Sequence, residues 1–157
     1  MIREMVKKDK KAVMDILRGT AMFTEAEVGV AGELIDLFLT NRNQTDYHIV
    51  VIENESHHVV GYLCWGPTPL TEGTHDLYWM AVAPDQQGSG FGKQLVKWLE
   101  HKVEERKGRM IVIETSSQPK YEPTRQFYLR AGYREVARIP EFYASGDDRV
   151  IYTKCFG

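Results

Sequence analysis

The chain has 157 residues, 43% of them hydrophobic and 27% charged, and its formal net charge at pH 7 is −2. This composition is typical of a globular protein with a real core, and the balanced charge gives no support to a nucleic-acid or membrane-surface role. No run approaches the roughly 18 apolar residues of a membrane span, and the charged N-terminus is unlike a signal peptide. We therefore expect one domain, residues 1–157, in the cytoplasm.

Cysteine and histidine give no sign of a metal site. Cys64 and Cys155 have no CxxC partner, and both lie in apolar, strand-like stretches where a buried, reduced thiol is expected. His57 and His58 are adjacent, so they point to opposite faces of an extended chain, and no third ligand is near. We predict neither a metal nor a disulfide.

The first elements expected along the chain are a short strand and two helices. The strand covers residues 2–6. Asp9 is predicted to cap a helix that runs to Arg18 and ends at Gly19.

The second helix has a clear start signal. Thr24 and Glu27 have the spacing of a capping box, and apolar residues then recur with helical period to about Thr40. The linker before this helix carries two large apolar side chains, Met22 and Phe23. They either fill the core or line a substrate pocket.

The rest of the chain alternates strands with two more helices. We predict strands at residues 48–52, 59–66, 75–82, 110–115, 133–139 and 149–154. A long helix with one apolar stripe begins at Phe91, and another lies between Pro123 and Gly132. Residues 140–148 are expected to form a loop. Only the unit from residue 75 to 115 requires a parallel strand pair, so we predict an α+β fold with a mixed, mostly antiparallel sheet of about seven strands and about four helices.

A glycine-rich turn joins the strand at residues 75–82 to the long helix. Gly88, Gly90 and Gly92 alternate there, which lets the backbone take positive φ and approach a ligand closely. Free N–H groups at a helix start, with the helix dipole, favour an anion such as phosphate. The turn therefore indicates a phosphate-binding loop, although an ordinary flexible loop would have a similar sequence.

Two common phosphate loops fit this turn poorly. A P-loop needs GxxxxGK followed by Ser or Thr, whereas Gln94 follows Lys93 here. A dinucleotide-binding fingerprint needs GxGxxG and an acidic residue about 20 residues further on. The glycines here give GxGxG, and Glu114 falls near the acidic position, so this option stays weakly open.

A third comparison fits better. Residues 84–92, PDQQGSGFG, resemble the acetyl-CoA motif of the GNAT superfamily of N-acetyltransferases, Q/R-x-x-G-x-G/A, whose fixed positions are filled by Gln87, Gly90 and Gly92. Residues 127–133, FYLRAGY, resemble a second segment of that superfamily, in which a tyrosine lies four residues before Gly-Phe or Gly-Tyr. The order of the expected strands and helices also resembles the GNAT fold over nearly the whole chain.

The chain departs from the GNAT pattern just before that second segment. Many members carry asparagine and alanine at two positions that are Tyr121 and Thr124 here. This puts in doubt any cofactor contact that the asparagine usually makes. It does not affect the expected fold.

The resemblance implies that acetyl-CoA binds where the strands at residues 75–82 and 110–115 splay apart. Its pantetheine arm would pair with the backbone of the first strand, and its pyrophosphate would lie on the N–H groups of the glycine turn. The residues expected to bind it are Met80, Ala81, Val82, Gln87, Gly88, Ser89, Gly90, Phe91, Gly92 and Lys93. No metal is implied.

The reaction implied by the resemblance is direct attack of an amine on the thioester, with a backbone N–H near Met80 holding the oxyanion. Tyr128 is the expected acid for the CoA thiolate, since a phenol with a pKa near 10 can donate a proton to it. Asp76 and Glu114 are candidate bases, and a water chain without a dedicated side chain is an equal alternative. His75 is a weaker candidate, expected at the surface.

The acceptor site is the least determined part. The resemblance places Phe23, Glu25, Tyr143 and Asp148 around it, and their acidic and aromatic side chains would suit a small cationic amine. Asp147 and Asp148 fit equally well as turn formers. We expect an acetyl-CoA-dependent N-acetyltransferase acting on a primary amine, in first place that of a small molecule, with peptide amines still open. The alternative is a catalytically silent CoA-binding module of the same fold, and a homodimer is a further option.

Overall fold

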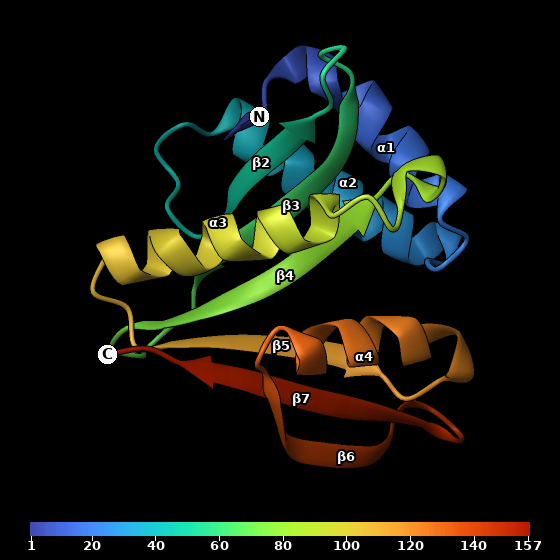
Figure 1. Ribbon diagram of the computed structural model, residues 1–157, viewed down its shortest axis with the longest axis vertical. Coiled ribbons are helices and arrows are strands. Elements are labelled where there is room, and N and C mark those ends of the chain that lie inside the picture. Colours follow the sequence, from blue (N-terminus) through green and yellow to red (C-terminus); the bar gives the residue numbers. More distant parts are fainter.

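Seven strands pair into one sheet in the computed structural model, which describes residues 1–157 (Figure 1). The strand order is β1-β2-β3-β4-β5-β7-β6, and every neighbouring pair is antiparallel except the parallel pair β4–β5. The strands are β1 Ile2–Glu4, β2 His48–Glu53, β3 Val59–Pro67, β4 Thr74–Val82, β5 Met110–Ser116, β6 Arg134–Ala144 and β7 Asp147–Cys155. The α+β fold with a mixed, mostly antiparallel sheet is therefore confirmed.

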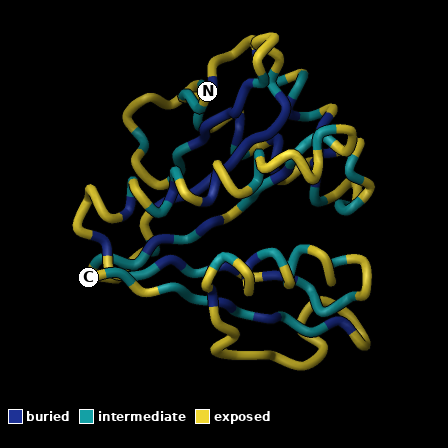
Figure 2. The backbone as a smooth tube through the Cα atoms, in the orientation of Figure 1, coloured by how far each residue is buried: buried dark blue, intermediate teal, exposed yellow.

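Four α-helices cover the faces of the sheet. They are α1 Lys10–Gly19, α2 Glu25–Thr40, α3 Phe91–Glu105 and α4 Glu122–Arg130, with short 3-10 turns at Lys7–Asp9, Pro84–Gln86 and Pro119–Tyr121. In Figure 1, α3 lies in front of β3 and β4, whereas α1 and α2 lie behind them. One core cluster packs on the α3 face and another on the α1 and α2 face. Figure 2 shows how strongly burial concentrates in β2 and β3.

Helix α3 is held on the sheet by one apolar stripe. Leu95, Leu99 and Val103 recur at intervals of four residues, and all three are fully buried. Burial of each such side chain contributes about 1.5–3 kcal/mol. Because α3 connects the end of β4 to the start of β5, this packing also fixes the glycine turn beside the end of β4.

The parallel pairing that positions the site is short. Thr74–Leu77 pairs with Met110–Ile113, and the two strands pair no further. Beyond this point β4 continues along β3 to Val82, and β5 continues along β7 to Ser116. The two parts of the sheet therefore diverge toward these strand ends, as Figure 1 shows.

The helix starts are predicted with mixed success. The capping box is confirmed, because Thr24 and Glu27 exchange side-chain and backbone hydrogen bonds of 3.1 Å at the start of α2. Asp9 lies at the N-cap position of α1, as predicted, but its side chain makes no capping hydrogen bond to that helix. Its carboxylate instead accepts the backbone N–H of Val6 at 2.8 Å and pairs with Arg3 at 2.8 Å. The cause is the 3-10 turn before α1, which takes up Asp9 as its last residue.

The expected loop at residues 140–148 is wrong. Strand β6 continues to Ala144, and β7 begins at Asp147 after a two-residue turn in which Gly146 has a φ of +76°. Pro140 suggested a break in the strand. Every residue of β6 is exposed at the edge of the sheet, where a proline is tolerated because its missing N–H faces no partner strand.

The two cysteines lie in different surroundings. Cys64 is buried on β3, and burial raises the pKa of its thiol to about 12, as expected for an inert thiol. Cys155 is exposed, contrary to expectation, because it lies at the last position of β7 where the sheet ends.

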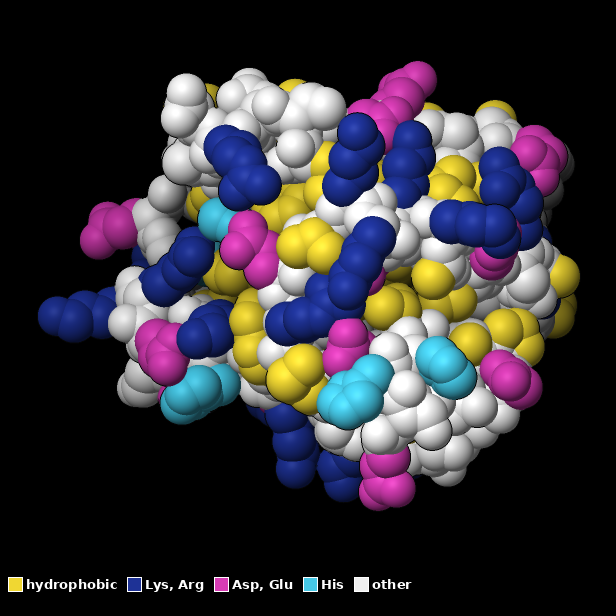
Figure 3. Space-filling model, turned by 90° about the horizontal axis from the view of Figure 1, so that it is seen from above, with side chains coloured by type: hydrophobic (Ala, Val, Ile, Leu, Met, Phe, Trp, Pro, Cys, Tyr) yellow, Lys and Arg dark blue, Asp and Glu magenta, His cyan; other side chains and the backbone are white.

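The surface carries both signs of charge. On the face seen in Figure 3, lysine and arginine side chains are interspersed with aspartate and glutamate, with apolar side chains between them. None of the helices is both long enough and apolar enough to cross a membrane.

Two histidines pack around Trp65 on the α3 face. The ring centroids of His48 and His75 lie 4.9 and 5.7 Å from that of Trp65, and the guanidinium of Arg106 lies 4.7 Å from the same ring. His75 is buried rather than at the surface as expected, because the backbone at Gly108 packs against it. Burial lowers the pKa of both histidines, and the positive charge of Arg106 lowers each further.

These histidines predict a loss of stability at mildly acidic pH. An unfolded histidine takes up a proton near pH 6.5, whereas His48 and His75 in the folded chain resist protonation, so the unfolded state binds more protons as the pH falls. The free energy of unfolding, measured by urea titration, should therefore decrease from about pH 6.5 to about pH 5. The double variant His48→Phe/His75→Phe should flatten this decrease, whereas His101→Phe on the exposed side of α3 should keep it. An unchanged pH dependence in the double variant would contradict the assignment.

Candidate active site

A cavity of about 1110 Å³ opens where β4 and β5 diverge. Both strands line it, together with the glycine turn, the linker between α1 and α2, the start of β7 and helix α4. A cavity of this size suits a small-molecule or cofactor site. It also brings together the two segments that carry the resemblance noted in the sequence.

The glycine turn enters this cavity at the start of α3. Gly88 and Gly90 have φ of +83° and +87°, and a Cβ atom added at either would meet nothing within 4 Å. Glycine is therefore needed there for backbone conformation rather than for space. Gly90 is the N-cap of α3 and has no side chain to cap it, so first-turn N–H groups are left for an anion.

The residues predicted to bind the donor gather in this cavity. Met80, Ala81, Val82, Gln87, Gly88, Gly90, Phe91, Gly92 and Lys93 all line it, and Ser89 does not. The side chain of Gln87 donates to the carbonyl oxygen of Val82 at 3.1 Å. Gln87 therefore ties the turn to the end of β4.

Tyr128 reaches the same cavity from α4. It is 5% exposed, and its ring packs against Phe127, Tyr133 and Tyr152 with centroids 5.3 to 6.4 Å away. Burial alone raises the pKa of its phenol above the ordinary value, so the hydroxyl stays protonated at neutral pH. It can therefore act as a proton donor to a group bound in the cavity.

The two candidate bases line the cavity in different states. Asp76 accepts a hydrogen bond from the hydroxyl of Thr68 at 2.7 Å through Oδ2. Glu114 is bound by the guanidinium of Arg149, whose Cζ atom lies 4.8 Å from the centroid of the Phe142 ring. His75, the weaker candidate, lies outside the cavity lining.

The residues predicted for the acceptor divide evenly. Phe23 and Tyr143 line the cavity, and Phe23 packs edge-on against Trp79 with a centroid distance of 5.3 Å. Met22 and Phe23 thus line the pocket, one of the two roles considered for them. Glu25 lies outside the lining, with its side chain 84% exposed and 3.9 Å from Arg18.

Asp148 also lies outside the cavity. Its carboxylate accepts the backbone N–H of Glu141 at 2.9 Å and pairs with Arg138 at 3.3 Å, so it holds the β6–β7 hairpin together. Glu27 and Asp147 line the cavity instead. Glu27 lies two residues after the predicted Glu25, and Asp147 lies one residue before the predicted Asp148.

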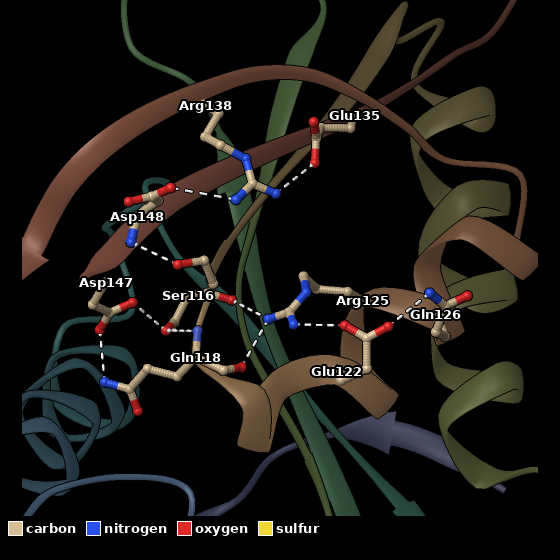
Figure 4. Close-up of polar contacts among 10 residues, drawn as sticks. Ser116, Gln118, Glu122, Arg125, Gln126, Glu135, Arg138, Asp147 and Asp148 are labelled. Carbon is tan, nitrogen blue, oxygen red and sulfur yellow. Dashed lines mark hydrogen bonds and ion pairs between the residues drawn. The ribbon is translucent and has the colours of Figure 1, made fainter.

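Asp147 belongs to a polar network that sequence reasoning missed (Figure 4). The residue is 7% exposed. Its carboxylate accepts hydrogen bonds from the hydroxyl of Ser116 and from the side-chain amide of Gln118, the latter at 2.8 Å. Arg125 on α4 donates to the carbonyl oxygens of Ser116 and Gln118 at 2.7 and 2.9 Å. The network fixes the end of β5 against β7 and α4. No local sequence pattern indicated it.

Tyr121 lies in the cavity lining at the position where many GNAT members have asparagine. Its hydroxyl donates to the carbonyl oxygen of Met22 at 3.0 Å, and Lys120 donates to the same oxygen at 3.1 Å. Burial raises the pKa of Tyr121 to about 12, and the negative charges of Glu27 and Asp147 contribute. The side chain therefore reaches the α1–α2 linker rather than the glycine turn.

Charge is distributed unequally along the cavity. Lys93 and Arg130 lie at the end formed by the glycine turn and α4, and both also line a neighbouring cavity of about 340 Å³. That smaller cavity adds Lys97 and Lys154, the latter paired with Glu100 at 2.9 Å. One end of the large cavity is thus cationic, whereas the other end carries two carboxylates, Glu27 and Asp147, and one lysine, Lys120.

A family model and solved structures agree with this arrangement. The model of the acetyltransferase (GNAT) domain matches residues 45–135. A crystal structure from Desulfovibrio desulfuricans, assigned to the GNAT family of acetyltransferases, is 43% identical with a TM-score of 0.92, over 99% of this chain and 98% of that one.

More distant structures share the fold. An aminoglycoside 6'-N-acetyltransferase complexed with coenzyme A is 20% identical with a TM-score of 0.75, over 99% of this chain and 96% of that one. A ribosomal-protein-alanine N-acetyltransferase from Brucella melitensis is 21% identical with a TM-score of 0.76, over 99% of both chains. No curated protein sequence matches the chain.

The family match covers more than half of the chain and includes both the glycine turn and Tyr128. The Desulfovibrio structure extends the likeness to nearly every residue. The chain therefore belongs to the GNAT family of acetyltransferases.

Proposed function

We propose that this protein transfers the acetyl group of acetyl-CoA to a primary amine of a small molecule, by direct attack in a ternary complex. The observation that carries the proposal is that one cavity contains both the start of α3, where Gly90 provides no side-chain cap, and the buried, protonated side chain of Tyr128. Its acidic far end supports a cationic acceptor. The experiment is to measure thiol release from acetyl-CoA with a panel of small primary amines. Tight CoA binding without release for any amine would instead identify a binding module.

The donor side of the cavity fits acetyl-CoA in three ways. The edge of β4 from Tyr78 to Val82 has no partner strand on the β5 side, so its backbone groups, apart from the Val82 carbonyl that Gln87 binds, are free to pair with the amide-containing pantetheine arm. The N–H groups at the start of α3 suit the pyrophosphate. Lys93 and Arg130 supply positive charge beyond the turn.

The reaction needs an acid and a proton acceptor. The amine nitrogen forms a bond to the thioester carbon, and a backbone N–H near Met80 holds the negative charge that develops on the oxygen. As the carbon–sulfur bond breaks, Tyr128 donates its proton to the thiolate. The acceptor is an ammonium at neutral pH and must give up one proton before its nitrogen can attack, so a proton acceptor is needed on the amine side. The nitrogen loses a second proton after attack, and this proton returns Tyr128 to its phenol form.

Asp76 is our choice for that proton acceptor. Its carboxylate accepts a hydrogen bond from the neutral hydroxyl of Thr68, whereas Glu114 is paired with the cation of Arg149 and is the weaker base for that reason. Asp76 lies four residues before Met80, roughly 13 Å along an extended strand. Water in the cavity therefore relays the proton between the amine and this carboxylate.

Replacing Tyr128 by phenylalanine tests the acid. We expect kcat to fall by about 10² or more, with the KM for acetyl-CoA changed by less than roughly twofold, because only the transferable proton is lost. Steady-state thiol release gives both constants. Tyr152→Phe, which alters a buried tyrosine outside the cavity lining, is the matched control. Similar losses in the two variants would point to packing instead of proton transfer.

Paired amide substitutions test the base. Asp76→Asn should lower kcat/KM for the amine by about tenfold or more at pH 7, whereas Glu114→Gln should change it by less than about threefold. The measurement is kcat/KM for the amine, from steady-state thiol release at pH 7. If both variants keep the wild-type value, the proton leaves through water alone.

Replacing Arg130 by alanine tests the cationic end. A lost charge-assisted hydrogen bond of about 1.5–3 kcal/mol predicts a rise of roughly tenfold or more in the KM for acetyl-CoA. If the bond is made to the ribose phosphate, acetyl-dephospho-CoA should show no such change. Arg134→Ala on the exposed strand β6 is the control and should leave both values unaltered. An equal effect on both donors would assign Arg130 to the pyrophosphate.

A further inference from the structure

One backbone oxygen joins the two halves of the molecule across the cavity. The carbonyl oxygen of Met22 accepts hydrogen bonds from Lys120 at 3.1 Å and from Tyr121 at 3.0 Å, across 98 and 99 residues of chain. Met22 lies in the linker between α1 and α2, on one side of the diverging sheet. Lys120 and Tyr121 lie in the 3-10 turn after β5, on the other side. We call this pair of hydrogen bonds the Met22 bridge.

The linker that carries Met22 is held in an unusual conformation. Ala21, the residue before it, has a φ of +55°, which is unfavourable for a residue with a Cβ atom. Such a conformation persists when surrounding contacts fix it. The other side-chain hydrogen bonds of the linker, which join Thr20 to Leu17 and to Met22, are local. The Met22 bridge is therefore its hydrogen-bonded attachment to the opposite half.

The bridge also sets the position of a cavity wall. Phe23 follows Met22 directly and packs edge-on against Trp79 of β4 inside the cavity. Glu27 lies one turn further along at the start of α2 and lines the same end. Fixing the Met22 carbonyl thus fixes the aromatic and acidic groups that face the acceptor.

The geometry leaves no passage for a second chain through the bridge. Neighbouring extended chains lie about 4.8 Å apart, whereas the hydroxyl oxygen of Tyr121 touches the Met22 oxygen at hydrogen-bond distance. An acceptor that enters the cavity while the bridge is intact must therefore end short of it. A polypeptide that had to continue between the two halves would break both hydrogen bonds.

We propose that Tyr121 and Lys120 are specificity-determining residues, which close the acceptor end through the Met22 bridge and restrict the enzyme to small free amines over polypeptide amines. This inference rests on the proposed function, and it decides between the two acceptor classes that the sequence left open. Tyr121 and Lys120 act by positioning the linker and take no part in proton transfer.

The test compares two acceptors in the full-length protein. The probes are a short aliphatic diamine and a ten-residue peptide with one central lysine and a blocked N-terminus. Wild type should acetylate the diamine and give no detectable product with the peptide. In Tyr121→Phe/Lys120→Met, the KM for the diamine should rise roughly threefold to tenfold from loss of the two bonds, and peptide acetylation should become measurable. The KM for acetyl-CoA should stay unchanged.

Matched variants separate the bridge from general damage. Tyr47→Phe removes a hydroxyl outside the cavity and should behave as wild type, and Lys120→Arg should retain the diamine KM because it keeps a donor. Hydrogen exchange at the amides of residues 20–23 should quicken in the double variant, with no change in the amides of β4. Unchanged exchange, or equal use of diamine and peptide by wild type, would overturn the inference. A wild-type protein that releases no thiol with any amine would overturn the proposed function, and the size limit with it.

Discussion

The site depends on where the parallel pairing of β4 and β5 stops. Beyond Leu77 and Ile113 each strand keeps a partner on one side only, so the facing edges carry unpaired N–H and C=O groups. A sheet that continued to pair would have no cavity there. The helix that crosses between these strands begins beside the same opening, so its free N–H groups lie next to the exposed edge of β4. One interruption in hydrogen bonding thus produces both the exposed strand edge and the free helix start to which we assign the donor.

The cavity separates charge because its two ends are built from different parts of the chain. Lys93 and Arg130 come from α3 and α4, which lie on one face of the sheet. Glu27 and Asp147 come from α2 and from the turn into β7. In the reaction that we propose, an anionic donor and a cationic acceptor would therefore be drawn toward opposite ends and meet between them. Tyr128 is buried and uncharged, so it adds no charge to either end of the cavity, and its phenol is suited to donate a proton.

The parts of the molecule that were predictable from sequence are those set by local pattern. The glycine turn, the α3 stripe and the capping box of Thr24 and Glu27 each need only a few neighbouring residues, and the structure contains all three. Two of the four residues predicted for the acceptor, Glu25 and Asp148, lie outside the cavity, and a near neighbour of each lines it instead. Glu25 and Glu27 differ by about 200° around a helix, and adjacent residues such as Asp147 and Asp148 point to opposite faces of a strand. Which member faces the cavity is decided by packing and register, which composition does not reveal.

Tyr121 marks the limit of the family pattern as a guide. The absence of the usual asparagine said only that one expected contact was in doubt. The replacement has a longer side chain, and its hydroxyl ends on a carbonyl 99 residues earlier in the chain. No periodicity or motif links two such positions, because the contact exists only once the two halves of the sheet have diverged by the right amount. Residues that depart from a family's pattern at a cavity wall are therefore where a shared fold acquires its individual specificity.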